Sequence, residues 1–219
     1  MQKTIKKTSK KLFDFDKSFN KIITGTDEAG RGSAAGGVFA GAVCFRKINS
    51  SLLEKLSLLN DSKQLSPAKR EYLYDFIKNE TINETVCIGV EEIEKYNILN
   101  SSLKAMKLAC EHVISRINSN NMLVLVDGSQ AIKNFHFPQQ CIVKGDSKSA
   151  SIAAASILAK VNRDRYMKEL GKNYPEYHWE QNAGYLTPEH FQAIDKYGIT
   201  TYHRKTFLHK YFEKQLKLF

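Results

Sequence analysis

The sequence predicts one α/β domain, with helices on the faces of a mixed sheet, and three observations support this prediction. Apolar segments at residues 21–28 and 38–45 flank a glycine-rich turn, as the two strands of a hairpin do. Beyond them, strand-like and helix-like segments alternate along the chain, which is typical of a sheet covered by helices. The 219 residues are 42% hydrophobic, and this content is enough for one sizeable core.

The elements that follow the hairpin can be placed in order. Ser66 and Pro67 begin a helix, because proline suits the first helical turn. Residues 84–93 have the composition of a third strand, and from Asn100 the apolar residues recur at helical spacing. A loop and a helix therefore separate the hairpin from the third strand.

The second half of the chain begins with a nearly continuous apolar segment at residues 122–128, which is typical of a strand buried on both faces. A short strand is expected over residues 140–146, and a long, alanine-rich helix over residues 151–172. After Tyr174, aromatic, histidine and glycine residues crowd around one short helix. We therefore expect three parts: a basic tail at residues 1–20, a core at residues 21–173 and a helical region at residues 174–219.

The charge of the chain favours a polyanionic partner. The formal net charge is +10, with a pI near 9.3, so nucleic acid is the leading candidate. Residues 1–21 hold seven lysines against Asp14 and Asp16, and residues 203–219 are also basic. The first of these stretches is either a solvated, disordered tail or an arm that binds phosphates.

Other features of the composition exclude several classes of protein. The chain has no apolar run of about 18 residues, and its start lacks the apolar stretch of a secretory signal, so we expect a cytoplasmic protein. The four cysteines lie far apart and form no CxxC pair, which argues against a zinc site or a disulfide framework. We expect buried, reduced thiols at Cys44, Cys87, Cys110 and Cys141.

Three of the expected strands end in carboxylates: Asp27 with Glu28, Asp127, and Asp146. A single acid at a strand end is often only a turn former or a helix cap. In open α/β sheets, however, functional groups from distant parts of the sequence gather where strands end. Clustered carboxylates repel one another unless cations neutralise them.

The kind of cation follows from the ligands. Oxygen donors without His or Cys select Mg²⁺ or Mn²⁺. A pair of such ions can activate a water and stabilise the leaving oxygen of an in-line displacement at phosphorus. The acids and the basic charge together indicate a nuclease or a polymerase.

Six blocks, in order, carry a resemblance to a known family: "GTDEAGRG", "NDSKQLS", "LVDG", "VKGDSKSASIAAASILAKVNRDR", "AGYLTPEH" and "YHRKTF". They resemble bacterial ribonuclease HII, the type 2 ribonuclease H, from about Lys21 to Phe207. The resemblance implies a ribonuclease H-like fold, with a five-stranded mixed sheet flanked by helices. The region 174–219 would then be a C-terminal helical piece that binds substrate next to the catalytic core.

The resemblance also implies an activity. Such an enzyme hydrolyses RNA in RNA/DNA hybrids and cuts on the 5′ side of single ribonucleotides in duplex DNA, leaving a 3′-hydroxyl and a 5′-phosphate. It would act by two-metal-ion catalysis with Mg²⁺ or Mn²⁺. The sequence shows no exposed apolar stripe that demands a partner, so we expect a monomer. The family's metal-binding catalytic acids fall on Asp27, Glu28, Asp127 and Asp146.

The family's recognition elements also have counterparts here. Gly30, Arg31 and Gly32 resemble a loop that reads the ribonucleotide 2′-hydroxyl through backbone groups. Glycines suit this role because bare backbone can approach the sugar closely, and the 2′-hydroxyl distinguishes RNA from DNA. Tyr185 matches a tyrosine that stacks on the deoxyribose after the ribonucleotide.

Further cationic positions match family residues that contact phosphate; they are Lys63, Lys144, His203 and Arg204. Asp164 is a fifth acid, but it lies well inside the expected long helix. We assign it a structural role in an ion pair with a neighbouring arginine.

The chain departs from the family pattern at two places. Ser33 and Gly37 stand where proline is common, so this segment is expected to be more flexible. Asn182 and Ala183 stand where the family usually has His-Lys, which removes a cation near the substrate.

Two other functions remain open at this point. One is a catalytically silent module that binds hybrids, although a pure binder has no use for four carboxylates directed at phosphates. The other is a type 3 ribonuclease H, which needs several consecutive ribonucleotides. Type 3 enzymes carry threonine in place of Arg31 and an added domain in front, so Arg31 and the short start favour type 2.

Overall fold

The computed structural model describes residues 2–46, 48, 54–56 and 65–216, and its sheet has the mixed topology that the sequence predicts. The strands are β1 (Ile22–Ala29), β2 (Val38–Phe45), β3 (Thr81–Ile88), β4 (Met122–Asp127) and β5 (Gln139–Ile142). They lie in the order β3-β2-β1-β4-β5. β2 is antiparallel to both β1 and β3, whereas β4 is parallel to both β1 and β5. The predicted hairpin is confirmed, and β1 occupies the centre of the sheet.

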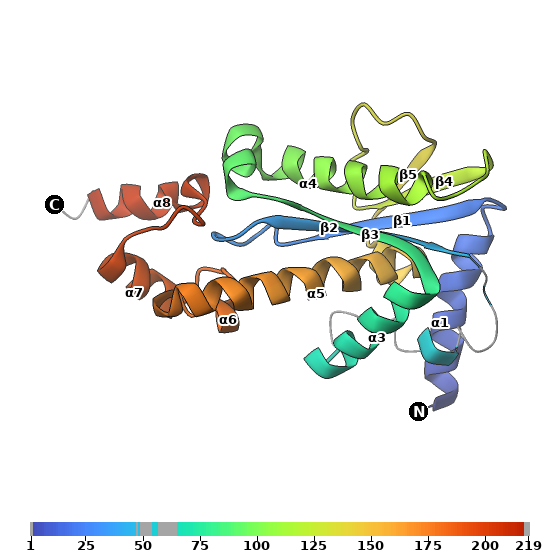
Figure 1. Cartoon of the computed structure of the whole chain (residues 1–219), viewed down its shortest axis with the longest axis horizontal. Coiled ribbons are helices and arrows are strands. Elements are labelled where there is room, and N and C mark those ends of the chain that lie inside the picture. The colour runs from blue at the N-terminus through green and yellow to red at the C-terminus, as the bar shows by residue number, and fades with distance from the viewer. Residues whose placement is uncertain (1, 47, 49–53, 57–64, 217–219) are drawn as a thin grey trace.

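Helices cover both faces of this sheet (Figure 1). They are α1 (Gln2–Lys17), α3 (Pro67–Glu80), α4 (Val90–Ile114), α5 (Ala150–Asn173), α6 (Trp179–Asn182), α7 (Pro188–Tyr197) and α8 (Lys205–Leu216), with 3-10 turns η2 (Gly145–Ser147) and η3 (Pro175–Tyr177). α4 packs on one face and α5 on the other, where α1 and α3 pack against α5. The entry of α3 is as predicted, because the Ser66 side chain accepts a hydrogen bond from Lys69 N–H.

The alanine-rich half of α5 lies directly on the central hairpin. A Cβ on Gly25 would come within 2.3 Å of Ile152 N, and one on Gly41 within 2.4 Å of the Ala155 carbonyl oxygen. Only glycine in the strands permits this approach. The predicted long helix is confirmed, and its small side chains bring it close to the strand that carries Asp27.

The third strand ends earlier than the predicted range 84–93. β3 stops at Ile88, and α4 begins at Val90. At Asn97 the backbone leaves the helical region, with a φ of 65° and a ψ of 164°, and its Oδ1 accepts from Asn100 N–H at 3.0 Å. Because this break interrupts the helical spacing, the sequence pattern revealed only the segment that starts at Asn100.

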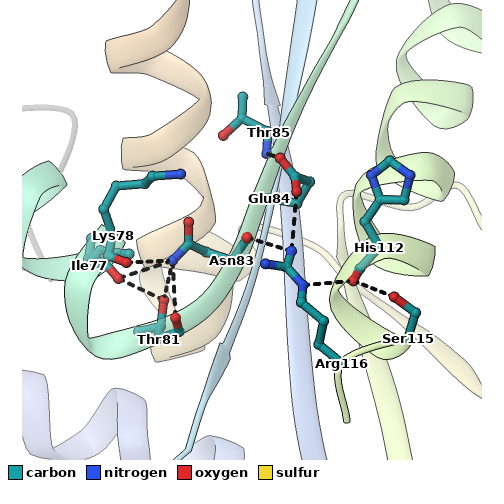
Figure 2. Close-up of polar contacts among 9 residues, drawn as sticks. All are labelled: Ile77, Lys78, Thr81, Asn83, Glu84, Thr85, His112, Ser115 and Arg116. Carbon is teal, nitrogen blue, oxygen red and sulfur yellow. Dashed lines mark hydrogen bonds and ion pairs between the residues drawn. The ribbon is translucent and has the colours of Figure 1, made fainter.

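A polar network fixes β3 at the edge of the sheet (Figure 2). Asn83 Nδ2 donates to the carbonyls of Lys78, at 3.1 Å, and Thr81, at 3.2 Å, where α3 ends. On the other side, Arg116 Nη2 donates to the Asn83 carbonyl at 2.8 Å and to Glu84 Oε2 at 3.2 Å. The edge strand is thereby tied to α3 and to the turn after α4.

The strand predicted over residues 140–146 is shorter than expected. β5 ends at Ile142, and Lys144 adopts a left-handed conformation with a φ of 55°. Asp146 therefore lies in the 3-10 turn η2 and not at a strand end. A non-glycine residue at positive φ is uncommon, so the composition gave no sign of this turn.

The interpretation of the lysine-rich start as a disordered tail is wrong, because residues Gln2–Lys17 form α1. Leu12 and Phe13 of this helix are buried in the core cluster under α5. Asp16 is also buried, and its Oδ2 accepts from Ser151 N–H at 2.9 Å and from Ser151 Oγ at 2.8 Å. Burial raises the pKa of Asp16, although these hydrogen bonds oppose that shift.

The region after Tyr174 contains more helical structure than the one short helix expected. α6, α7 and α8 follow α5 and pack around Trp179 in a cluster of their own. Figure 1 shows this region beyond the end of α5, to one side of the sheet.

The thiol prediction is only partly confirmed. All four cysteines are free, but Cys87 is exposed and Cys141 is half-buried, while Cys44 and Cys110 lie inside. Within the described parts of the chain, no helix is long and apolar enough to span a bilayer.

Replacing Asp16 by Ala is expected to lower the free energy of unfolding by about 1–3 kcal/mol, because a buried N–H and a buried hydroxyl lose their acceptor. Urea denaturation measures the loss. Asp14→Ala is the matched control, since Asp14 is an exposed acid on the same helix. Equal losses in the two variants would show that Asp16 does not anchor α1.

Candidate active site

The parallel pairing of β1 with β4 brings two of the predicted acids to one edge of the sheet. Thr26 is the partner of Val126 in this register, so Asp27 and Asp127 are each the next residue along. Glu28 follows at the end of β1, and Asp146 lies on η2, just beyond β5. The fold therefore brings together acids that are about 100 residues apart in the sequence.

Burial and neighbouring charges shift the pKa of two of the acids, Asp27 and Glu28. Asp27 is 7% exposed, and burial raises its pKa well above the usual range, with further increases from the negative charges of Glu28, Asp127 and Asp146. Burial also raises the pKa of Glu28, while Arg31 opposes that shift and Asp127 adds to it. The negative charges of the four acids are therefore close enough to act on one another.

Each of three carboxylates accepts a hydrogen bond. Asp27 Oδ1 accepts from Glu28 N–H at 2.7 Å, Asp127 Oδ1 accepts from Gly145 N–H at 2.6 Å, and Glu28 Oε1 pairs with Arg31 Nη1 at 3.0 Å. As these side chains lie, the described residues contain no cluster of three or more Asp, Glu, His or Cys side chains that could hold a metal ion. The chemistry of the donor set still suits a hard cation, because all four side chains offer carboxylate oxygens and Asp27 is close enough to the other three to feel their charges.

A cavity of about 390 Å³ joins the first two acids to the predicted recognition residues. Its lining residues include Asp27, Glu28, the loop Gly30, Arg31 and Gly32, and Tyr185, together with Arg70, Lys160 and Arg163. Tyr185 is 45% exposed, as a stacking residue requires. Asp127 and Asp146 do not line this cavity, and Lys144 is exposed just before η2. Lys63 lies outside the described residues.

Sequence reasoning missed the three cations in this cavity. They are Arg70, Lys160 and Arg163. Lys160 and Arg163 share one face of α5 with Ser156, because the three residues are spaced by three or four positions. This spacing is visible in the sequence and is the signal that could have revealed the two α5 cations. Asp164 pairs with Lys160 at 2.6 Å and with Arg70 at 3.6 Å, which agrees with the predicted structural role, although neither partner is the neighbouring arginine expected.

The structure does not present His203 and Arg204 to phosphate, contrary to the sequence interpretation. They are 2% and 0% exposed. Arg204 Nε donates to the Gly36 carbonyl at 2.9 Å, and its Nη1 donates to the Arg31 carbonyl at 3.2 Å. Backbone carbonyls from a distant loop offset the cost of burial, and no local sequence pattern reveals them.

His203 belongs to a buried chain of hydrogen bonds whose protons can be assigned. Trp179 Nε1–H donates to His190 Nε2 at 3.1 Å, so the His190 proton sits on Nδ1, which bonds to the Tyr185 carbonyl at 2.9 Å. His203 Nδ1 accepts from Thr200 N–H at 2.9 Å, and its Nε2 lies 3.1 Å from His190 Nε2. Both rings are neutral, and their chain ends on the backbone of Tyr185.

Comparison with known proteins identifies the family. The family model described as Ribonuclease HII matches residues 24–214. The chain belongs to the ribonuclease HII family. It is therefore a type 2 ribonuclease H, an endonuclease that acts on RNA in RNA/DNA hybrids.

Members of the ribonuclease HII family from several bacteria align along most of the chain. Ribonuclease HII of Fusobacterium nucleatum is 47% identical, with 93% of each chain covered. Ribonuclease HII of Anaplasma phagocytophilum is 45% identical, covering 89% of this chain and 91% of its own. The crystal structure of ribonuclease H2 from Pyrococcus horikoshii has a TM-score of 0.66 at 24% identity, over 84% of this chain and 92% of that one. It confirms the ribonuclease H-like fold.

Because His190 and His203 are buried in the C-terminal region, we expect the free energy of unfolding to fall in acid. Burial, aided by the neighbouring His190, lowers the pKa of His203 from 6.5 to about 4. The unfolded chain therefore binds more protons than the folded chain between these values, so stability falls as the pH drops from 6.5 to 4. We expect a loss on the order of 2 kcal/mol from this residue.

Urea unfolding at several pH values measures this loss. His203→Gln is expected to show a flatter dependence between pH 6.5 and 4, whereas the exposed His209→Gln control should follow the unmodified protein. Parallel curves for all three proteins would exclude His203 as the source.

Proposed function

We propose that the enzyme cuts on the 5′ side of single ribonucleotides in duplex DNA, as well as in RNA/DNA hybrids, leaving a 3′-hydroxyl and a 5′-phosphate. One observation carries this proposal: Asp27 and Glu28 share a cavity with the loop Gly30–Gly32 and with Tyr185. A sugar held by the loop would place its phosphate beside the acids. Recognition and hydrolysis would thus take place on the same nucleotide.

The four acids are proposed to hold Mg²⁺ or Mn²⁺, in a family that depends on divalent metal ions. Two such ions, when bound, would activate the attacking water and stabilise the leaving oxygen. The raised pKa of Asp27 supports this role, because a cation would relieve the repulsion from its neighbours. Glu28 and Asp127, which now accept hydrogen bonds from Arg31 and from Gly145 N–H, would supply two of the carboxylates that hold the ions.

The remaining parts of the chain have supporting roles in this proposal. Tyr185 stacks on the following deoxyribose, and Lys144 contacts a phosphate near Asp146. The region 174–219 carries Tyr185 and forms the substrate-binding side of the cavity. The basic charge of the chain as a whole favours binding to a duplex.

A duplex with one embedded ribonucleotide, labelled at both ends, tests the function. The unmodified protein is expected to cut it once, with Mg²⁺ or Mn²⁺ present, and to leave the ends named above. Binding without cleavage would instead establish a silent hybrid-binding module. Cleavage only when several ribonucleotides are consecutive would establish a type 3 activity.

Replacing Asp127 by Asn is expected to lower kcat by at least about 100-fold, because the amide is a poorer metal ligand than the carboxylate. The Asn Oδ1 can still accept from Gly145 N–H, so folding should be preserved. Asp75→Asn is the control, since it makes the same chemical change at an exposed site on α3. A normal rate for Asp127→Asn with Mg²⁺ would rule out its role as a ligand.

A further inference from the structure

The loop that follows β1 rests on two buried arginines. Arg163 is 1% exposed and Arg204 is 0% exposed, and neither forms an ion pair with a carboxylate of the described residues. Burial lowers the pKa of both guanidinium groups, and the charge of Arg163 contributes to the shift of Arg204. Two buried cations without acids are costly, so their hydrogen-bond acceptors must compensate.

Those acceptors come largely from the loop itself. Arg204 binds the carbonyls of Arg31 and Gly36, at 3.2 and 2.9 Å. Arg163 Nη2 donates to Ser33 Oγ at 2.6 Å and contacts the Ala35 carbonyl at 3.4 Å. The carbonyl side of the loop is therefore turned toward the interior.

This arrangement decides where the loop N–H groups point. In a planar trans peptide, the carbonyl of one residue and the N–H of the next point in opposite directions. Because the Arg31 carbonyl is held inward, the Gly32 N–H is directed outward. Ser33 Oγ lies 3.1 Å from the Gly30 carbonyl, and this contact directs the Arg31 N–H outward in the same way. Neither N–H has a partner among the described residues, and both residues line the cavity.

Ser33 is the link between the loop and Arg163. Its side chain is fully buried, and its oxygen accepts from Arg163 while its single proton is available to the Gly30 or Ala35 carbonyl, at 3.1 and 3.2 Å. The proline that is common at this position has no such hydroxyl. The expected flexibility at Ser33 is therefore countered by a buried, charge-assisted hydrogen bond.

Arg163 also joins this loop to the segment before Tyr185. Its Nη2 donates to the Ala183 carbonyl at 2.9 Å, and its guanidinium carbon lies 5.9 Å from the centre of the Tyr185 ring. A Cβ on Gly30 would come within 2.0 Å of Arg163 Nε. The Arg163 guanidinium thus lies on the interior side of the loop and links Ser33 to the Ala183 carbonyl.

We infer that Ser33 and Arg163 are positioning residues for ribonucleotide recognition, which hold the Arg31 and Gly32 N–H groups toward the 2′-hydroxyl of the bound sugar. The inference rests on the proposed function, since it concerns the same site. Discrimination between ribose and deoxyribose would then depend on Ser33 and Arg163, which are buried and need not touch the substrate.

Binding measured without metal separates this inference from the chemistry. Fluorescence anisotropy in EDTA gives the Kd for a duplex with one ribonucleotide and for the same duplex made only of DNA. The unmodified protein is expected to bind the ribonucleotide duplex more tightly. We express discrimination as the Kd for the all-DNA duplex divided by the Kd for the ribonucleotide duplex. In Ser33→Ala this ratio should fall about tenfold, because the loop loses its link to Arg163.

Two further variants make the result specific. Arg163→Lys keeps the charge but not the planar fork, and should also reduce the ratio. Ser102→Ala, which removes a buried serine hydroxyl from α4, should leave the ratio unchanged. Circular dichroism establishes which variants are folded.

A Kd ratio within twofold of the unmodified value, in a folded Ser33→Ala or Arg163→Lys variant, would overturn the inference. It would also be overturned if neither variant folds, since the pair would then serve the fold alone, or if the unmodified protein binds both duplexes equally. None of these results alters the cleavage test of the proposed function. Absence of cleavage by the unmodified protein would defeat that function instead.

Discussion

The contact between α5 and the central hairpin is the constraint on which the site depends. Gly25 and Gly41 let the helix backbone approach the strands to distances that any side chain would block. At one end of the helix, Ser151 holds α1 through Asp16. Further along, the same helix places Lys160 at the cavity beside Asp27 and Glu28, places Arg163 against the interior side of the loop, and then leads into the C-terminal helices. Since one straight element spans all of these points, their relative positions are set by its close packing on the sheet.

Charge is divided across the loop between β1 and β2. On one side, four carboxylates converge, and Asp27 resists ionisation because of burial and its neighbours. On the other side, Arg163 and Arg204 are buried without carboxylate partners and bind backbone oxygens. The two groups are not neutralised against each other, because the backbone of the loop lies between them. This separation leaves the acids without ion pairs to Arg163 or Arg204, and these two arginines orient the peptide groups of the loop.

The sequence predicted the parts of this structure that depend on local patterns. The hairpin, the buried strand β4 and the long helix α5 followed from β-branched runs and helical spacing, and the convergence of Asp27 with Asp127 followed from parallel strand ends. The failures arose where tertiary contacts overrode local chemistry. The lysines of residues 1–21 left a disordered tail open as one interpretation. In the structure, Leu12, Phe13 and Asp16 lie on a face of α1 that is buried against the core. The resemblance assigned His203 and Arg204 to phosphate contact, but both are buried, and the acceptors of Arg204 lie about 170 residues away in the loop after β1.

The two departures from the family pattern meet at one side chain. Ser33 and Ala183 are 150 residues apart, yet Arg163 Nη2 donates to both. The contact with Ala183 uses a backbone carbonyl, which every residue type provides, so the side chain at that position can change without loss of the bond. The contact with Ser33 uses the side chain itself, so only a residue with an acceptor there can make it. The contact with Arg163 therefore does not fix the residue type at position 183, whereas the hydroxyl at position 33 bears on the geometry of the loop.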